Sequence, residues 1–282
     1  MGEKAFSFVK LEELPPKPRR RGIVEIRGPY YTPVTYGYLK ALLEDWAEYI
    51  DGYKFAGGSM RLLDRDKVKA ITSLCHDHGL YVSTGGFVER VIVQGPEAVD
   101  RYIEECKALG FDVVEVSSGL APIPLEDKVE IVKEVKRRGL KPKPEITFML
   151  GAGAGTEVVG YAEEAKFRGL DDVIKEAALH LRAGAEMLML ESEGVTEGLP
   201  PSQWKLAEIR ALVDRFGYER WMFEAAEPPV FKWYLKHVGR DVNVFIDHSQ
   251  VVEFNAWRLG LWGDRAIWEG KEVRYRAPSP SR

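Results

Sequence analysis

Four stretches of this sequence share one pattern: HDHGLYVST (residues 76–84), KALGFDVVEVS (107–117), KRRGLKPKPEI (136–146) and LRAGAEMLMLE (181–191). In each stretch an amphipathic segment ends in a glycine, and a short apolar run follows. Glycine is favoured just after a helix because it adopts the left-handed conformation at little cost. The apolar runs are typical of parallel strands, which are buried on both faces. The pattern therefore predicts repeated helix–strand units.

The same pattern, extended in both directions, predicts eight strands, at residues 22–27, 51–55, 80–84, 112–117, 140–148, 186–191, 220–224 and 242–247. Helices are expected between or after them, at residues 35–49, 96–109, 125–138, 170–182, 230–237 and 250–261. Eight such alternations favour an α/β fold with a single (β/α)8 TIM barrel, which needs about 250 residues. A doubly wound open sheet alternates similarly, but no GxGxxG follows the first strand, which weakens its dinucleotide-binding version.

We expect the barrel to occupy residues 21–263, between an N-terminal arm (1–20) and a C-terminal tail (264–282). A basic cluster at residues 17–21 is interpreted as a solvated lead into the first strand, with binding to an acidic partner as the alternative. The formal net charge of −4 gives no electrostatic case for nucleic acid. No stretch resembles a membrane span, and the two cysteines offer no disulfide framework, so a reduced cytoplasmic protein is expected.

Ionisable residues end almost every predicted strand, which is where barrels of this type hold their reactive groups. They are Glu25, Arg27, Lys54, Glu115, Glu145, Glu191, Glu224 and Asp247, with Glu89 as a further candidate. One charge at a strand end is usually solvated and idle, but these ends converge on one pocket. The carboxylates would repel one another there unless cations joined them. Arg27, Lys54 and a bound Mg²⁺, which prefers oxygen ligands, are the expected cations.

Small residues follow three of the strands, in KFAGGS (54–59), TGG (84–86) and GAGAGT (151–156). Backbone N–H groups can approach an anion closely where side chains are small. Each loop alone is a weak signal, because a glycine-rich turn is common after a strand. The long stretch 150–169 is a candidate lid, with a plain surface excursion as the alternative.

Two histidine-containing motifs suggest other chemistry but fit it poorly. AspHisSer at 247–249 resembles part of a hydrolase triad, yet no nucleophile-elbow GxSxG is present, so His248 is expected to bind substrate. HisAspHis at 76–78 lies near a predicted helix C-terminus, at the opposite end of the barrel. It suits the helix dipole better than a metal site.

Several of these segments resemble the phosphosulfolactate synthase family. They are DGYKFAGGS (51–59), YVSTGG (81–86), ECKALGFDVVEV (105–116), MFEA (222–225) and FIDHSQV (245–251). The resemblance covers roughly residues 20–263. EIRGPYYT (25–32) and DHSQV resemble in particular the branch that includes the heat-stress-associated proteins of plants.

The resemblance implies a (β/α)8 barrel that adds sulfite to phosphoenolpyruvate with Mg²⁺, giving 2-phospho-3-sulfolactate. Sulfite would attack C3, and a metal would stabilise the negative charge that builds on the carboxylate side. A general acid must then protonate C2, and cations must hold two anionic reactants together. The expected site has three groups of residues: catalytic Lys54, Glu115 and Glu145; substrate-binding Arg27, Ser59, Gly85, Gly86, Ser117, His248 and Arg258; and metal-binding Glu191, Glu224 and Asp247.

One departure from the family's pattern leaves the proton donor open. In the archaeal enzymes a lysine soon follows the strand-five glutamate, whereas here no lysine occurs between Glu145 and Lys166. Either Lys54 or Lys166 takes that role, or the reaction differs. The alternatives are a related barrel enzyme acting on another phosphorylated or carboxylated molecule, and a non-catalytic protein of heat-stress tolerance. A homo-oligomer is expected, because barrels with exposed apolar helix faces often associate.

Overall fold

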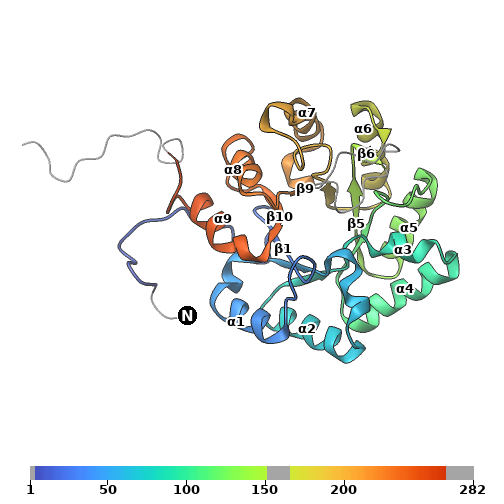
Figure 1. The fold of residues 1–282 in the computed structure, drawn as a ribbon, viewed down its shortest axis with the longest axis horizontal. Coiled ribbons are helices and arrows are strands. Elements are labelled where there is room, and N and C mark those ends of the chain that lie inside the picture. Colours follow the sequence, from blue (N-terminus) through green and yellow to red (C-terminus); the bar gives the residue numbers. More distant parts are fainter. Residues whose placement is uncertain (1–3, 151–165, 265–282) are drawn as a thin grey trace, which may run out of the picture.

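Eight parallel strands close into a barrel in a computed structural model that describes residues 4–150 and 166–264 (Figure 1). Around the barrel the strands follow the order β1-β10-β9-β8-β5-β4-β3-β2. They are β1 (Val24–Arg27), β2 (Gly52–Lys54), β3 (Tyr81–Ser83), β4 (Val113–Val116), β5 (Lys141–Ile146), β8 (Leu188–Leu190), β9 (Trp221–Glu224) and β10 (Asn243–Asp247). The predicted single (β/α)8 barrel is confirmed.

The helices form a ring outside the strands (Figure 1). They are α1 (Tyr36–Trp46), α2 (Arg65–Asp77), α3 (Val88–Ile92), α4 (Pro96–Leu109), α5 (Leu125–Arg137), α6 (Leu170–Arg182), α7 (Leu206–Phe216), α8 (Pro228–His237) and α9 (Val251–Arg258). Six of them, α1, α4, α5, α6, α8 and α9, match the predicted ranges, whereas α2, α3 and α7 were not among those ranges. The four glycines of the recurring pattern adopt left-handed φ values, of 72° at Gly79, 85° at Gly110, 86° at Gly139 and 103° at Gly184. No helix in the described ranges is long and apolar enough to cross a bilayer.

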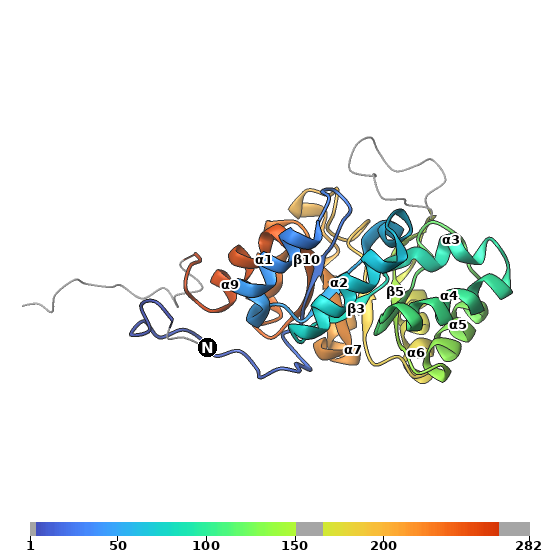
Figure 2. The same cartoon turned by 90° about the horizontal axis from the view of Figure 1, so that it is seen from below.

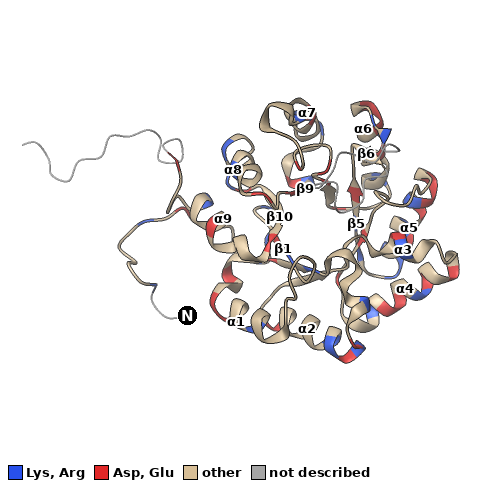
Figure 3. Cartoon of the chain, viewed as in Figure 1, with Lys and Arg blue, Asp and Glu red and all other residues tan. Residues whose placement is uncertain are grey.

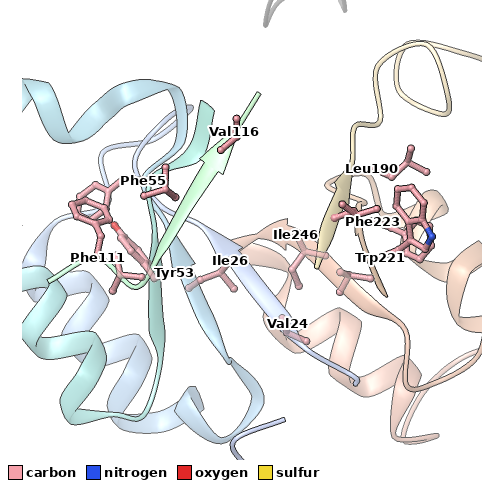
Figure 4. Close-up of a cluster of buried hydrophobic side chains, with 14 of the residues drawn as sticks. Val24, Ile26, Tyr53, Phe55, Phe111, Val116, Leu190, Trp221, Phe223 and Ile246 are labelled. Carbon is pink, nitrogen blue, oxygen red and sulfur yellow. The ribbon is translucent and has the colours of Figure 1, made fainter. Parts of the chain in front are cut away.

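Strand residues alternate between the ring of helices and the barrel centre, as the period of two requires. In β1, Val24 and Ile26 belong to the buried hydrophobic cluster beneath the helices, which also includes Phe223 and Ile246 (Figure 4). The intervening Glu25 forms an ion pair with a residue of β5 on the far side of the barrel. The outward residues therefore make the core, and the inward ones are free to carry chemistry.

A second, smaller apolar cluster fills the N-terminal half of the barrel. It consists of Ile23, Met189, Met222 and Phe245, with Tyr81 and Met187 packed against it. These side chains exclude water from below, so polar groups nearer the C-terminal ends of the strands lie in a low-dielectric setting.

The predicted fifth strand ends earlier than expected, at Ile146, and the chain then turns away from the barrel. Met149–Leu150 (β6) pairs antiparallel with Lys166–Phe167 (β7). The candidate lid at 150–169 is described only at these two ends. Its glycine-rich part, 151–156, and nearly all of the expected tail, 264–282, lie outside the described residues.

The N-terminal arm is anchored where a solvated segment was expected. Lys17 Nζ donates to the carbonyl of Ala47 at 2.6 Å, and Arg19 Nη1 pairs with Asp51 Oδ1 at 2.9 Å. The other oxygen of Asp51 accepts the Val24 N–H at 2.9 Å. The arm thus binds the carbonyls that end α1 before it enters β1, and it lies on the side of the barrel that α1 and α9 cover (Figure 2).

A substitution at Gly28, the residue after β1, tests how closely β1 and β2 approach one another. A Cβ atom there would lie 2.7 Å from the Lys54 carbonyl oxygen and 2.6 Å from the Tyr53 ring. Gly28→Ala should lower the free energy of unfolding by about 1–3 kcal/mol in a urea titration. Gly37→Ala is the matched control, because a Cβ there meets nothing within 4 Å and helix α1 should gain ~0.5–1 kcal/mol. Equal stability of Gly28→Ala and the parent protein would contradict the close approach.

Candidate active site

Inward side chains in the middle and at the C-terminal ends of the strands form a buried network of charges. All are buried except Glu191, which is half-buried. We call this set the mouth cluster; it consists of Glu25, Arg27, Lys54, Glu115, Lys143, Glu145, Glu191 and Glu224. Figure 3 marks the acidic and basic positions along the ribbon. Six of the eight barrel strands thus contribute a charge, in the middle, at the end or just beyond it, and the convergence predicted from the sequence is confirmed.

Lys54 is a fixed cation at the end of β2. Its Nζ lies 2.8 Å from Glu115 Oε2 and 4.0 Å from the centre of the Phe245 ring. Burial acts against the charge, but Glu115, Glu25 and the other nearby carboxylates outweigh it and raise the pKa of Lys54. A lysine held so firmly in its charged form suits binding and charge stabilisation better than proton donation.

Lys143 on β5 links its own strand to β1 and β4 through two ion pairs. Its Nζ lies 2.5 Å from Glu25 Oε1 and 3.2 Å from Glu115 Oε2. Sequence reasoning overlooked this residue, because it sought a lysine after Glu145 and this one lies two residues before it. The alternation in KPKPEI was the available signal, since residues two apart in a strand point to the same face.

Arg27 is the second fixed cation of the mouth. Its Nη2 lies 2.6 Å from Glu224 Oε1, and the guanidinium lies over the Tyr31 ring, 4.8 Å from its centre. Burial favours the neutral form of Glu224, but Arg27, a hydrogen bond with Glu191 and the charge of Lys54 lower its pKa overall. Glu224 is therefore held as a carboxylate.

Two other carboxyl groups are held in their protonated forms. Burial, then the charge of Glu115, raises the pKa of Glu145 to about 8. Burial, then the charge of Glu224, also raises the pKa of Glu191. The mouth cluster thus places neutral acids beside fixed charges, which is a common arrangement for proton transfer.

Three carboxyl groups could hold a metal ion once Glu191 gives up its proton. Glu191, Glu197 and Glu224 offer oxygen atoms that all lie within 4.8 Å of one another. An all-oxygen set suits Mg²⁺. Glu197 was not expected, because it lies in the loop after β8 and no pattern marks it. Asp247, expected in this set, instead caps the turn that follows β10: its Oδ1 accepts from the backbone N–H of Ser249 at 2.9 Å.

The expected substrate-binding residues after β2, β3 and β4 lie in loops that pack together. Ser117 Oγ donates to the Gly86 carbonyl at 3.3 Å. Gly85 has a φ of 60°, and a Cβ there would lie 2.7 Å from the Phe55 carbonyl oxygen. The Ser59 hydroxyl is buried and has no hydrogen-bond partner within the described ranges. The glycines serve close packing; binding of an anion by these loops stays a prediction.

His248 and Glu89 organise loops around the mouth. His248 lies between the Tyr38 hydroxyl, 2.8 Å from Nδ1, and the Thr32 hydroxyl, 3.0 Å from Nε2. It therefore ties the end of β10 to the loop after β1. Glu89 accepts the backbone N–H groups of residues 119–121 at 3.1, 2.7 and 2.6 Å, and so orders the loop after β4.

Arg258 does not reach the mouth, contrary to expectation. Its Nη1 donates to the carbonyl of Gly22 at 2.8 Å, at the N-terminal start of β1. The physical reason is the direction of α9, which runs from the C-terminal ends of the strands back to the opposite end. Lys166, the alternative proton donor, is exposed on β7.

Solved structures share the fold. N-acetylneuraminate lyase from Mycoplasma synoviae superposes with a TM-score of 0.51 at 12% identity, over 88% of this chain and 74% of that one. An HpcH/HpaI aldolase from Desulfitobacterium hafniense gives 0.50 at 10% identity, over 92% and 96%. At such low identity, the likeness supports the barrel fold alone.

Sequence relatives are more informative. Protein HEAT-STRESS-ASSOCIATED 32 of Arabidopsis thaliana is 33% identical over 261 residues, which is 89% of this chain and 91% of that protein. The phosphosulfolactate synthase of Methanocaldococcus jannaschii is 28% identical over 80% of this chain and 88% of its own length; that of Methanothermobacter thermautotrophicus is 26% identical over 92% and 96%. The pattern of the (2R)-phospho-3-sulfolactate synthase (ComA) family matches residues 12–264. The chain therefore belongs to the phosphosulfolactate synthase family.

Proposed function

We propose that this protein catalyses the Mg²⁺-dependent addition of sulfite to phosphoenolpyruvate, forming 2-phospho-3-sulfolactate. The observation that carries the proposal is the mouth cluster, in which fixed cations, a carboxylate set and a protonated acid lie together in the barrel. Membership of the family and the two archaeal relatives named phosphosulfolactate synthases support it.

The charge balance of the mouth cluster supports a divalent cation. Together with Glu197 it contains six carboxyl groups and three cationic groups, so full ionisation would leave an excess of three negative charges. Buried charge of one sign is costly unless protons or cations offset it. The raised pKa values of Glu145 and Glu191 indicate where protons are held when no cation is bound. One Mg²⁺ bound through Glu191 would replace the Glu191 proton and offset two of the charges, and Glu145, which is not in the ligand set, would keep its proton and offset the third.

The positive groups suit two anionic reactants. Lys54 and Arg27 would attract phosphoenolpyruvate and sulfite and hold them against one another. As the sulfur–C3 bond forms, the electron pair of the C2–C3 double bond moves toward C1, and the carboxylate end gains negative charge. Mg²⁺ held by Glu191, Glu197 and Glu224 would supply Lewis-acid stabilisation of that charge.

The reaction ends with proton transfer to C2, and Glu145 suits this role better than either lysine. It is buried, and its pKa of about 8 keeps it protonated at neutral pH. Lys54 has a raised pKa and Lys166 is exposed. The Glu145 proton forms the C2–H bond, and the carboxylate left behind lies near the charge of Lys54, which stabilises it.

Two alternative functions, a related enzymatic reaction and a non-catalytic role, make different predictions about the mouth cluster. A related reaction on another phosphorylated or carboxylated molecule would use the same residues. A non-catalytic role, suggested by the name of the Arabidopsis relative, gives no reason to bury so many charges, since their desolvation costs stability. The expected cytoplasmic location and homo-oligomer stay predictions.

The purified protein should consume phosphoenolpyruvate only when sulfite and Mg²⁺ are both present, as followed by enol absorbance and ³¹P NMR. Lys54→Met should lower kcat/KM about 100-fold or more, because a charge at the reacting centre is lost. Lys141→Met, which removes an exposed lysine at the other end of β5, should leave kcat/KM unchanged. The proposed reaction would be excluded if the unmodified protein showed no turnover and if phosphoenolpyruvate, sulfite and Mg²⁺ all failed to raise its melting temperature.

Glu145 should give the protein a distinctive pH dependence. Its folded pKa of about 8 exceeds the usual 4.5, so its contribution to stability is complete below pH 4.5 and is lost as the pH rises through 8. From pH 5 to 8.5, Glu145→Gln should gain about 1–3 kcal/mol of unfolding free energy relative to the parent protein. Its kcat should fall about 100-fold at every pH. Exposed Glu130→Gln is the control, and parallel stability curves for all three proteins would refute a protonated Glu145.

Measurements of metal affinity can distinguish the ligand set seen in the structure, which includes Glu197, from the set expected from the sequence, which includes Asp247. Glu197→Gln should weaken Mn²⁺ binding about 10-fold or more in calorimetric titrations, because it removes a charged ligand. Asp247→Asn should leave the affinity nearly unchanged, because Asp247 is engaged in a cap. The opposite ranking of the two variants would restore Asp247 to the metal site.

A further inference from the structure

A second buried group of charges lies behind β5, outside the barrel. We call it the outer cluster; it consists of Lys128 on α5, Arg168 just before α6, and Glu176 and His180 on α6. Lys128, Glu176 and His180 are only 1%, 3% and 0% exposed. None of them belongs to the mouth cluster, and the proposed mechanism gives them no role.

Lys128 connects three separate segments through one ammonium group. Its Nζ lies 2.7 Å from Glu176 Oε1 on α6 and 3.1 Å from Ser118 Oγ in the loop after β4. Its third hydrogen bond, at 2.6 Å, goes to the backbone carbonyl of Glu145. The lysine thus holds the main chain of the residue to which we assign proton transfer.

Glu176 gathers the remaining members of the cluster. Its Oε2 lies 2.5 Å from Arg168 Nη1, and its Oε1 lies 3.3 Å from His180 Nε2. Burial lowers the pKa of His180, so the neutral ring donates from Nε2. Arg168 Nη1 also donates to the Thr147 carbonyl at 3.1 Å. The cluster therefore binds the two carbonyls that flank Ile146.

The strand itself explains why such support is needed. β5 contains Pro142 and Pro144, which have no N–H and cannot donate to the sheet. Its pairing with β4 ends at Pro144 opposite Val116, so the Glu145 carbonyl lies beyond that ladder. Among the described strands, Glu145 pairs with Met189 of β8 alone. Its backbone is thus weakly constrained by the sheet, and Lys128 supplies the partner that β4 does not.

We propose that Lys128, Glu176 and Arg168 are positioning residues, which fix the backbone at 145–147 and so direct the Glu145 carboxyl group into the mouth cluster. Stability alone gives little reason for the arrangement, because well-packed apolar residues generally stabilise a core as well as buried ions do. The catalytic part of this proposal rests on the proposed function; the backbone part does not.

The test compares Lys128→Met and Glu176→Gln with Lys133→Met and Glu130→Gln, which alter an exposed ion pair on α5. Hydrogen exchange by mass spectrometry is measured without substrate, and kcat and KM are measured with phosphoenolpyruvate, sulfite and Mg²⁺. In the outer-cluster variants, amides at 145–149 should exchange about tenfold faster, while peptides from β1 and β10 stay unchanged. Turnover should fall about tenfold in kcat with KM nearly constant, because positioning rather than binding is lost. Both controls should match the parent protein.

Unchanged exchange at 145–149 in a folded variant would overturn the proposal, and so would a uniform increase across the barrel, which indicates a merely structural role. Should Lys128→Met fail to fold, Arg168→Met provides the same test, because its side chain is 15% exposed and its loss frees the Thr147 carbonyl. If exchange responds but the parent protein shows no turnover, only the proposed function fails. If the parent protein turns over and both exchange at 145–149 and kcat are unchanged, only the positioning role fails.

Discussion

The chain of buried ion pairs that links Glu25, Lys143, Glu115 and Lys54 is the interaction on which the site depends. It crosses from β1 through β5 and β4 to β2, with pair distances of 2.5, 3.2 and 2.8 Å. Ions buried this deeply must be paired, because an uncompensated charge in the interior costs several kcal/mol. This series of ion pairs therefore fixes the geometry of the barrel mouth. It also holds Lys54 in its charged form where reactants would enter.

The barrel remains stable despite the cost of burying these charges, because apolar packing on both sides of the strands stabilises the fold. The outward residues of every strand pack under the helices, and the apolar cluster around Met222 and Phe245 closes the barrel from below. The mouth is therefore a buried, charged region with an excess of carboxyl groups. Protons on Glu145 and Glu191 offset most of that excess when no metal is bound, and a divalent cation bound through Glu191 would replace the Glu191 proton. Metal binding and proton release are thus expected to be linked.

Much of this was accessible from the sequence, for identifiable reasons. Glycine-ended helices and buried apolar runs predicted the barrel, because they report local conformation directly. Strand-end residues such as Lys54 were placed correctly, because a closed barrel brings those ends together. Glu197 was missed because a loop residue carries no periodic signal. Arg258 was misplaced because its position depends on the direction of a whole helix. The anchoring of the arm through Arg19 depends on tertiary contacts that no local pattern encodes.

We propose that the excess of carboxyl groups in the mouth serves to hold a divalent cation. The most direct test is a crystal structure of the protein grown with Mn²⁺, with anomalous differences measured at the manganese edge. Bound Mn²⁺ should give one strong peak within coordination distance of oxygens from Glu191, Glu197 and Glu224. A map with no peak in the barrel mouth, or with the ion bound elsewhere and these three carboxyl groups still hydrogen-bonded to protein alone, would contradict this proposal.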